Sequence, residues 1–79
     1  MVKVYVWKIR TAKHITLMEL SQLSRLGKST INNIETGKTS PTLNQLESLA
    51  RALNVSMEEL YDSPYKANGE KYFHDYGNI

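Results

Sequence analysis

The segment that decides the fold of this chain is residues 16–37, TLMELSQLSRLGKSTINNIETG. Thr16 and Glu19 have the spacing of a capping box, in which the hydroxyl and the carboxylate each accept an amide of the other residue at a helix start. A second helix is expected to begin after Gly27 and to end at Gly37, a residue suited to the left-handed position beyond a helix. The segment therefore predicts two short helices joined by a turn of about three residues.

Apolar spacing predicts which sides of these two helices face a core. Leu17, Leu20 and Leu23 form the expected buried stripe of the first helix, and Ile31 and Ile34 that of the second. Beyond them, Thr42 with Gln45 and Ser56 with Glu59 repeat the capping box. They predict an amphipathic helix after Pro41 and a short last helix near Met57–Tyr61. An extended start over Val2–Val6 should lead into a first helix that ends near His14, which makes the chain all-α.

The outward side of the expected helix 28–35 carries small polar and cationic side chains. Lysine donates to guanine O6 and N7, asparagine pairs with adenine N6 and N7, and serine can donate or accept. A plain solvated surface is the alternative, but asparagine is a poor helix former and offers little to a bare surface. The pattern favours a helix that enters the major groove of DNA with Lys28, Ser29, Asn32 and Asn33.

Charge and composition narrow the classes of function. The net charge is +2, but residues 1–38 carry +5 and residues 39–79 carry −3, as one surface that faces a polyanion would produce. The chain has no cysteine, no leader-like start and no apolar run of the roughly 18 residues that span a bilayer. We therefore expect a cytoplasmic protein that does not contact membranes. The two histidines, His14 and His74, form no catalytic or metal-binding pattern, so neither an enzyme nor a cofactor or metal is expected.

Two longer strings then give the chain a family resemblance: Ile34-Glu-x-Gly-Lys-x-x-Pro41 and Leu49-Ala-x-Ala-Leu-x-Val-Ser56. With residues 17–33, they resemble the Cro and phage-repressor type (Xre family) helix-turn-helix proteins. The resemblance implies a compact five-helix domain over residues 1–63, with the helix-turn-helix core at 16–35, whose third helix reads base edges. It also implies phosphate contacts from Thr16, Leu17, Thr36, Lys38 and Thr39, and an ion pair between Arg10 and Glu35.

Three positions depart from the family pattern. Arg25 stands where the turn usually has glycine, and an arginine at positive φ costs on the order of 1 kcal/mol, which leaves the turn open to rearrangement. Gly27 replaces the usual serine cap of the third helix, and Ser21 replaces a small alanine where the two helices cross.

Residues 64–79 form an aromatic, polar tail. Asn68-Gly69 is a hairpin turn signal, and Tyr65, Tyr72, Phe73 and Tyr76 are much aromatic surface to leave in water. A mobile polar tail is one interpretation. The other is a hairpin that packs beside Val2–Val6, within one chain or across a dimer.

Together these features predict a sequence-specific, double-stranded DNA-binding transcriptional regulator that acts as a repressor. A homodimer on a pseudo-palindromic operator is expected, because one small domain covers a single half-site. The alternative is an antitoxin-like or other interaction module whose main partner is a protein that binds the aromatic tail.

Overall fold

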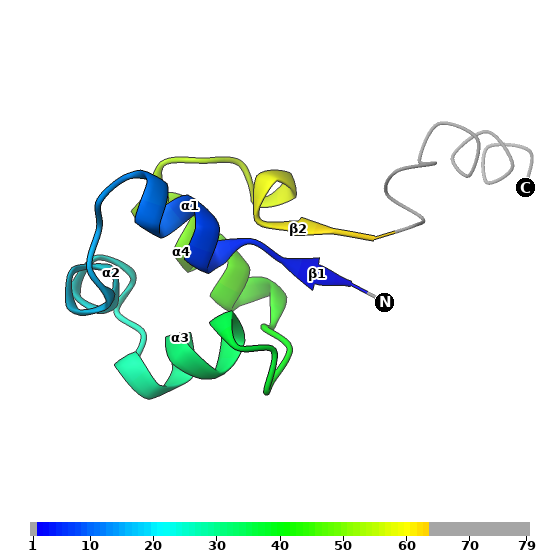
Figure 1. Cartoon of the computed structure of the whole chain (residues 1–79), viewed down its shortest axis with the longest axis horizontal. Coiled ribbons are helices and arrows are strands. Elements are labelled where there is room, and N and C mark those ends of the chain that lie inside the picture. The colour runs from blue at the N-terminus through cyan, green and yellow to red at the C-terminus, as the bar shows by residue number, and fades with distance from the viewer. Residues whose placement is uncertain (1, 64–79) are drawn as a thin grey trace, which may run out of the picture.

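The computed structural model describes residues 2–63, in which a pair of short strands closes one end of a group of packed helices (Figure 1). The predicted turn signal at Asn68-Gly69 and the tail hairpin lie outside the described residues. The elements are, in chain order, β1 Lys3–Val4, α1 Val6–Ala12, α2 Leu17–Ser24, α3 Lys28–Glu35, α4 Leu43–Leu53, a 3₁₀ helix η1 Met57–Leu60 and β2 Tyr61–Asp62.

Side-chain caps fix the starts of α2, α4 and η1 where the sequence places them. The Thr16 hydroxyl accepts the Glu19 amide at 3.1 Å, and the Glu19 carboxylate accepts the Thr16 amide at 2.9 Å. Thr42 and Gln45 make the same two bonds at the start of α4. At η1 the Glu59 carboxylate accepts the Ser56 amide at 2.8 Å. These bonds satisfy amides that a helix end leaves without partners.

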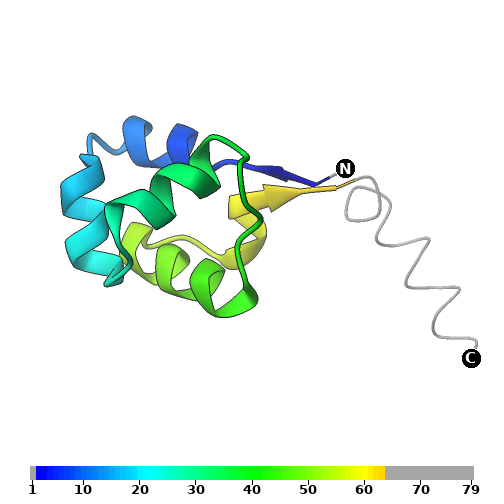
Figure 2. The ribbon, with the colours of Figure 1, turned by 90° about the horizontal axis from the view of Figure 1, so that it is seen from below.

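The core lies between α1, α2, α3 and α4 and is closed by η1. Its fully buried members come from every one of these elements: Val6, Leu20, Ile31, Ile34, Leu49, Leu53 and Leu60. Helix α2 packs against both α3 and α4, so that α3 lies across the molecule with one side against the core and one side outward (Figure 2).

The two strands join the beginning of the described chain to its end. They are antiparallel, with Lys3 opposite Asp62 and Val4 opposite Tyr61. The extended start is therefore present, although the pairing with residues 61 and 62 was not predicted. Figure 2 shows the two strands side by side, away from α2.

The structure differs from the sequence predictions at two places, the last helix and the buried side of α2. Residues 2–63 contain four α-helices, and the fifth expected helix is a single 3₁₀ turn, so a count of five α-helices is not confirmed. The prediction that Leu23 is buried is wrong, because its side chain is 60% exposed. Ser24 is buried in its place, since residue 24 lies one turn after Leu20 on the inward side of α2.

None of the helices within residues 2–63 has the length and apolar composition needed to cross a membrane.

Candidate nucleic-acid interface

Helix α3 separates its side chains into a buried and an outward set. Ile31 and Ile34 are buried against the core, which fixes the helix about its own axis. Three of the four side chains predicted to contact bases, Lys28, Ser29 and Asn32, are exposed, and Asn33 is half-buried. None of these four side chains hydrogen-bonds to another group of residues 2–63, so their donors and acceptors have no partner within the described part of the chain.

The turn before α3 keeps a left-handed residue although the chain has no glycine there. Arg25 has φ 63° and ψ 20°, so the turn is not rearranged. Two serines hold it: the Ser21 hydroxyl donates to the Leu26 carbonyl at 2.6 Å, and the Ser24 hydroxyl accepts the Leu26 amide at 3.2 Å. These bonds offset strain that costs on the order of 1 kcal/mol. From the sequence, Ser21 was interpreted only as the replacement of a small alanine where the two helices cross, and neither bond was predicted.

The start of α3 carries no side-chain cap. Gly27 is the N-cap, with φ −64° and ψ 149°, and no side chain accepts the first amides of the helix. There is also no acidic residue in the first turn of α3. An uncapped helix start with a nearby lysine is chemically suited to a negative group, because the helix dipole and the open amides favour negative charge there.

An ion pair between Arg10 and Glu35 joins α1 to the end of α3. Arg10 Nε lies 2.7 Å from Glu35 Oε2, and Nη2 lies 3.1 Å from Oε1, a two-pronged contact. Arg10 Nη1 also donates to the Ile15 carbonyl, just before α2, at 2.9 Å. The hydrogen bond to Glu35 raises the pKa of Arg10 above its ordinary value, although burial opposes this. One guanidinium therefore fixes the relative positions of α1, α2 and α3.

The start of α2 combines an exposed hydroxyl with a carboxylate. Thr16 uses its oxygen as an acceptor in the capping box, which leaves its hydroxyl hydrogen able to donate outward. Leu17, the other predicted phosphate contact here, begins the helix and is half-buried. Glu19 is exposed, and the Thr16 amide that it accepts holds its pKa below the usual range. Thr16 and Leu17 can donate to an anion there only beside a charged carboxylate.

The loop after α3 presents the remaining three predicted phosphate contacts, all of them exposed. The Thr36 hydroxyl donates to the Asn32 carbonyl at 2.9 Å, and the Thr39 amide donates to the Asn33 carbonyl at 3.2 Å. Gly37 has φ 80°, as expected for the residue beyond the helix end. These bonds hold the loop against the end of α3. Thr36, Lys38 and Thr39 therefore come next along the chain after the outward polar side chains of the helix.

The chain is similar to known helix-turn-helix proteins. A helix-turn-helix family model matches residues 8–60. Among solved structures, the chain is similar to the restriction-modification controller protein C.AhdI from Aeromonas hydrophila, with 31% sequence identity and a TM-score of 0.66. That match covers 68% of this chain and 82% of the other. Among curated proteins, no significant match was found.

Proposed function

Because the chain belongs to the Xre/Cro-type helix-turn-helix family of DNA-binding regulators, we propose that it is a sequence-specific repressor of transcription. It reads operator DNA with α3. The single observation that carries the proposal is the outward side of α3. It holds amide, hydroxyl and ammonium groups with no internal partner within residues 2–63, next to an uncapped helix start.

In this proposal, the residues of the interface divide into two classes. Lys28, Ser29, Asn32 and Asn33 contact base edges in the major groove, where bidentate amide and ammonium contacts discriminate between base pairs. Thr16, Leu17, Thr36, Lys38 and Thr39 contact phosphates, which set the position of the domain on the duplex without reading sequence. Arg10 and Glu35 contact no DNA and hold α3 at its angle.

A homodimer on a pseudo-palindromic operator completes the proposal. A domain of this size covers one half-site, and two copies related by a two-fold axis match half-sites about one turn of DNA apart. Repression then follows from promoter occupancy and depends on the concentration of the protein. The similarity to C.AhdI makes the control of restriction-modification genes the first regulatory role to test.

The alternative is an antitoxin-like or other protein-interaction module. A domain that had exchanged DNA for a protein partner would have little use for cationic and amide side chains on α3. The retained Lys28, Asn32 and Asn33 favour DNA.

The test compares two substitutions on a cognate duplex and on an unrelated one. Asn33→Ala should weaken binding to the cognate duplex by about 1–3 kcal/mol and leave binding to the unrelated duplex unchanged. Lys38→Ala should weaken both alike and lower the slope of log affinity against log salt by about 1. Equal losses on both duplexes for both variants would contradict the assigned roles.

A further inference from the structure

The capping boxes of α2 and α4 have the same geometry and differ in charge. At α2 the Glu19 carboxylate accepts the Thr16 amide at 2.9 Å, and the Thr16 hydroxyl accepts the Glu19 amide at 3.1 Å. At α4, Gln45 and Thr42 make the same two bonds at the same distances. A neutral amide forms the box in this fold with the same geometry, so the box does not require the negative charge of Glu19.

The charge of Glu19 has no cationic partner in the described part of the chain. Residues 1–46 contain two acidic residues, Glu19 and Glu35. Glu35 is almost wholly buried and is paired with Arg10. Glu19 is exposed and forms no ion pair within residues 2–63, and the Thr16 amide that holds its pKa low keeps it charged at neutral pH. One free negative charge therefore stands in the basic half of the chain.

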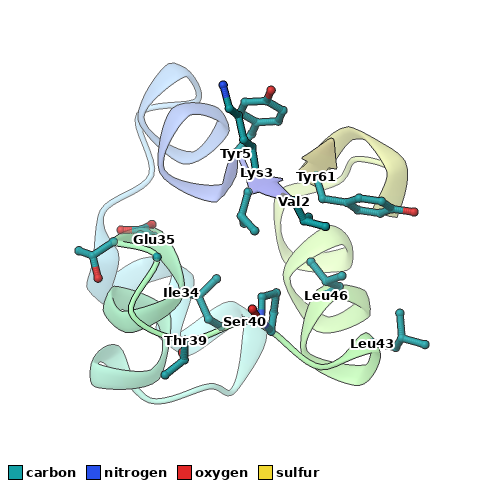
Figure 3. A pocket seen from close by; sticks show the side chains of 14 residues that line it. Val2, Lys3, Tyr5, Ile34, Glu35, Thr39, Ser40, Leu43, Leu46 and Tyr61 are labelled. Atoms are coloured by element: carbon teal, nitrogen blue, oxygen red, sulfur yellow. The ribbon is translucent and has the colours of Figure 1, made fainter. Parts of the chain in front are cut away.

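The two groups of predicted phosphate contacts differ in their distance from this charge. At the start of α2, Thr16 is hydrogen-bonded to Glu19 itself. The loop after α3, which includes Lys38 and Thr39, contains no acidic residue. The acid that precedes the loop is Glu35, and Figure 3 shows Glu35 and Thr39 at separate places in the wall of the hollow beside this loop. The loop can approach a phosphate without repulsion from a free carboxylate, and the start of α2 cannot.

We propose that Glu19 limits the affinity of this protein for DNA by repelling the phosphate that the start of α2 contacts. This role rests on the proposed function, which places Thr16 and Leu17 against a phosphate. A carboxylate and a phosphate that bond to neighbouring groups at one helix start lie about 6 Å apart. Between the limits for bulk water and for a protein surface, and with screening by salt, their repulsion corresponds to a change in affinity of about threefold to tenfold.

The repulsion is independent of base sequence because the repelled group is a phosphate. It lowers the affinity for a cognate duplex and for an unrelated duplex by the same factor. Glu19 therefore sets the protein concentration at which the operator becomes occupied, and the choice of sequence is left to α3.

The substitution Glu19→Gln in the full chain tests this role, since Gln45 shows that glutamine preserves the box. The matched control is Glu59→Gln, which removes the same charge from the box at the start of η1. Figure 1 shows η1, the yellow turn before β2, at the far side of the domain from α3. Affinities are measured by titration of labelled cognate and unrelated duplexes.

The expected result is a gain that belongs to Glu19 alone. At about 0.1 M salt, Glu19→Gln should bind both duplexes about threefold to tenfold more tightly, and Glu59→Gln should stay within about 1.5-fold of the natural chain. At about 0.5 M salt the gain should fall below about twofold, because the charges are screened. Both variants should unfold within about 3 °C of the natural Tm. Lost structure would weaken binding, so it does not explain a gain.

Unchanged or weaker binding by Glu19→Gln would overturn the proposal. An equal gain in Glu59→Gln would overturn it as well, because the effect would then follow net charge and not position. In either case a natural chain that still prefers its cognate duplex keeps the proposed function. A natural chain without sequence preference would contradict the proposed function itself, so the two failures are distinguishable.

Single neutral phosphates locate the repulsion on the DNA. A set of cognate duplexes, each with one phosphate replaced by an uncharged methylphosphonate, is titrated with the natural chain and with Glu19→Gln. The advantage of the variant should disappear on the duplex that lacks the charge next to Thr16 and should remain on the others. An advantage that persists on every duplex would overturn the proposal, because no single phosphate would then face Glu19.

Discussion

The two sides of α3 differ in what the rest of the molecule requires of them. Ile31 and Ile34 are buried, and Glu35 at the end of the helix pairs with Arg10. Lys28, Ser29 and Asn32 are exposed and make no side-chain hydrogen bond to another group of residues 2–63. One side of the helix therefore has its contacts within the fold, and the other has polar groups that are open to water and to a ligand.

The difference predicts that stability and binding are separable in this helix. Substitutions on the buried side should unfold the domain, and those on the outward side should leave its stability almost unchanged. The following variants, from the largest expected effect to the smallest, measure how complete that separation is.

Ile34→Ala should have the largest effect. The side chain is 1% exposed, and removing three carbons from a packed core leaves a cavity, so the free energy of unfolding should fall by about 3 kcal/mol. Urea denaturation measures it. Leu23→Ala is the matched control, because this leucine is 60% exposed, and its loss should cost about 0.5 kcal/mol or less. Similar losses in both variants would mean that the core is not where the structure places it.

Arg10→Ala should come next. The Glu35 side chain is only 5% exposed, and without the guanidinium its carboxylate stays buried and unpaired, which costs about 3 kcal/mol. Arg51→Ala, at an exposed position on α4, should change stability by about 0.5 kcal/mol or less in the same denaturation series. If Arg10→Ala proves as mild as Arg51→Ala, the ion pair does not hold α3 in place.

Asn32→Ala should have the opposite profile on the outward side. Alanine is the better helix former, so the free energy of unfolding should stay the same or rise by about 0.5 kcal/mol. Binding to cognate DNA should weaken by about 1–3 kcal/mol, as measured by titration with a labelled duplex. A stability loss above about 1 kcal/mol would show that this asparagine belongs to the fold, and the separation of the two sides would fail.

Gly27→Ser should have the smallest effect, a gain. The φ of −64° suits any residue, and an added Cβ meets only Thr30 Oγ1, at 3.9 Å, an ordinary contact. Serine would cap α3 and restrict the unfolded chain, so thermal unfolding should show about 0.5 kcal/mol more stability. Gly37→Ser, at φ 80°, should instead lose about 1 kcal/mol. A loss at both glycines would indicate that α3 starts elsewhere.

The sequence was most informative where the interactions are local. A capping box joins residues three apart, so Thr16, Thr42 and Ser56 could be identified as helix starts without any knowledge of packing. The helical spacing of Ile31 and Ile34, with polar residues between them, likewise predicted which side of α3 is buried.

The remaining features depend on contacts that no local pattern encodes. Leu23 and Ser24 are adjacent at the edge of the buried stripe of α2, and the packing against α4 decides which of them turns inward. Hydrophobicity alone pointed to the wrong one. The left-handed Arg25 is held by Ser21 and Ser24, and the pairing of β1 with β2 joins residues almost 60 positions apart. Which side chains of α3 contact DNA stays a prediction from chemistry and family resemblance.

The central claim, that α3 reads DNA sequence, is tested most directly by selection of binding sites from a random duplex pool, with the natural chain and Asn33→Ala in parallel. If α3 reads sequence, the natural chain should enrich a pseudo-palindrome whose half-sites lie about one helical turn apart, and the variant should lose this enrichment. Equal enrichment of the same sequences by both proteins, or no enrichment by either above a salt-sensitive background, would contradict the claim.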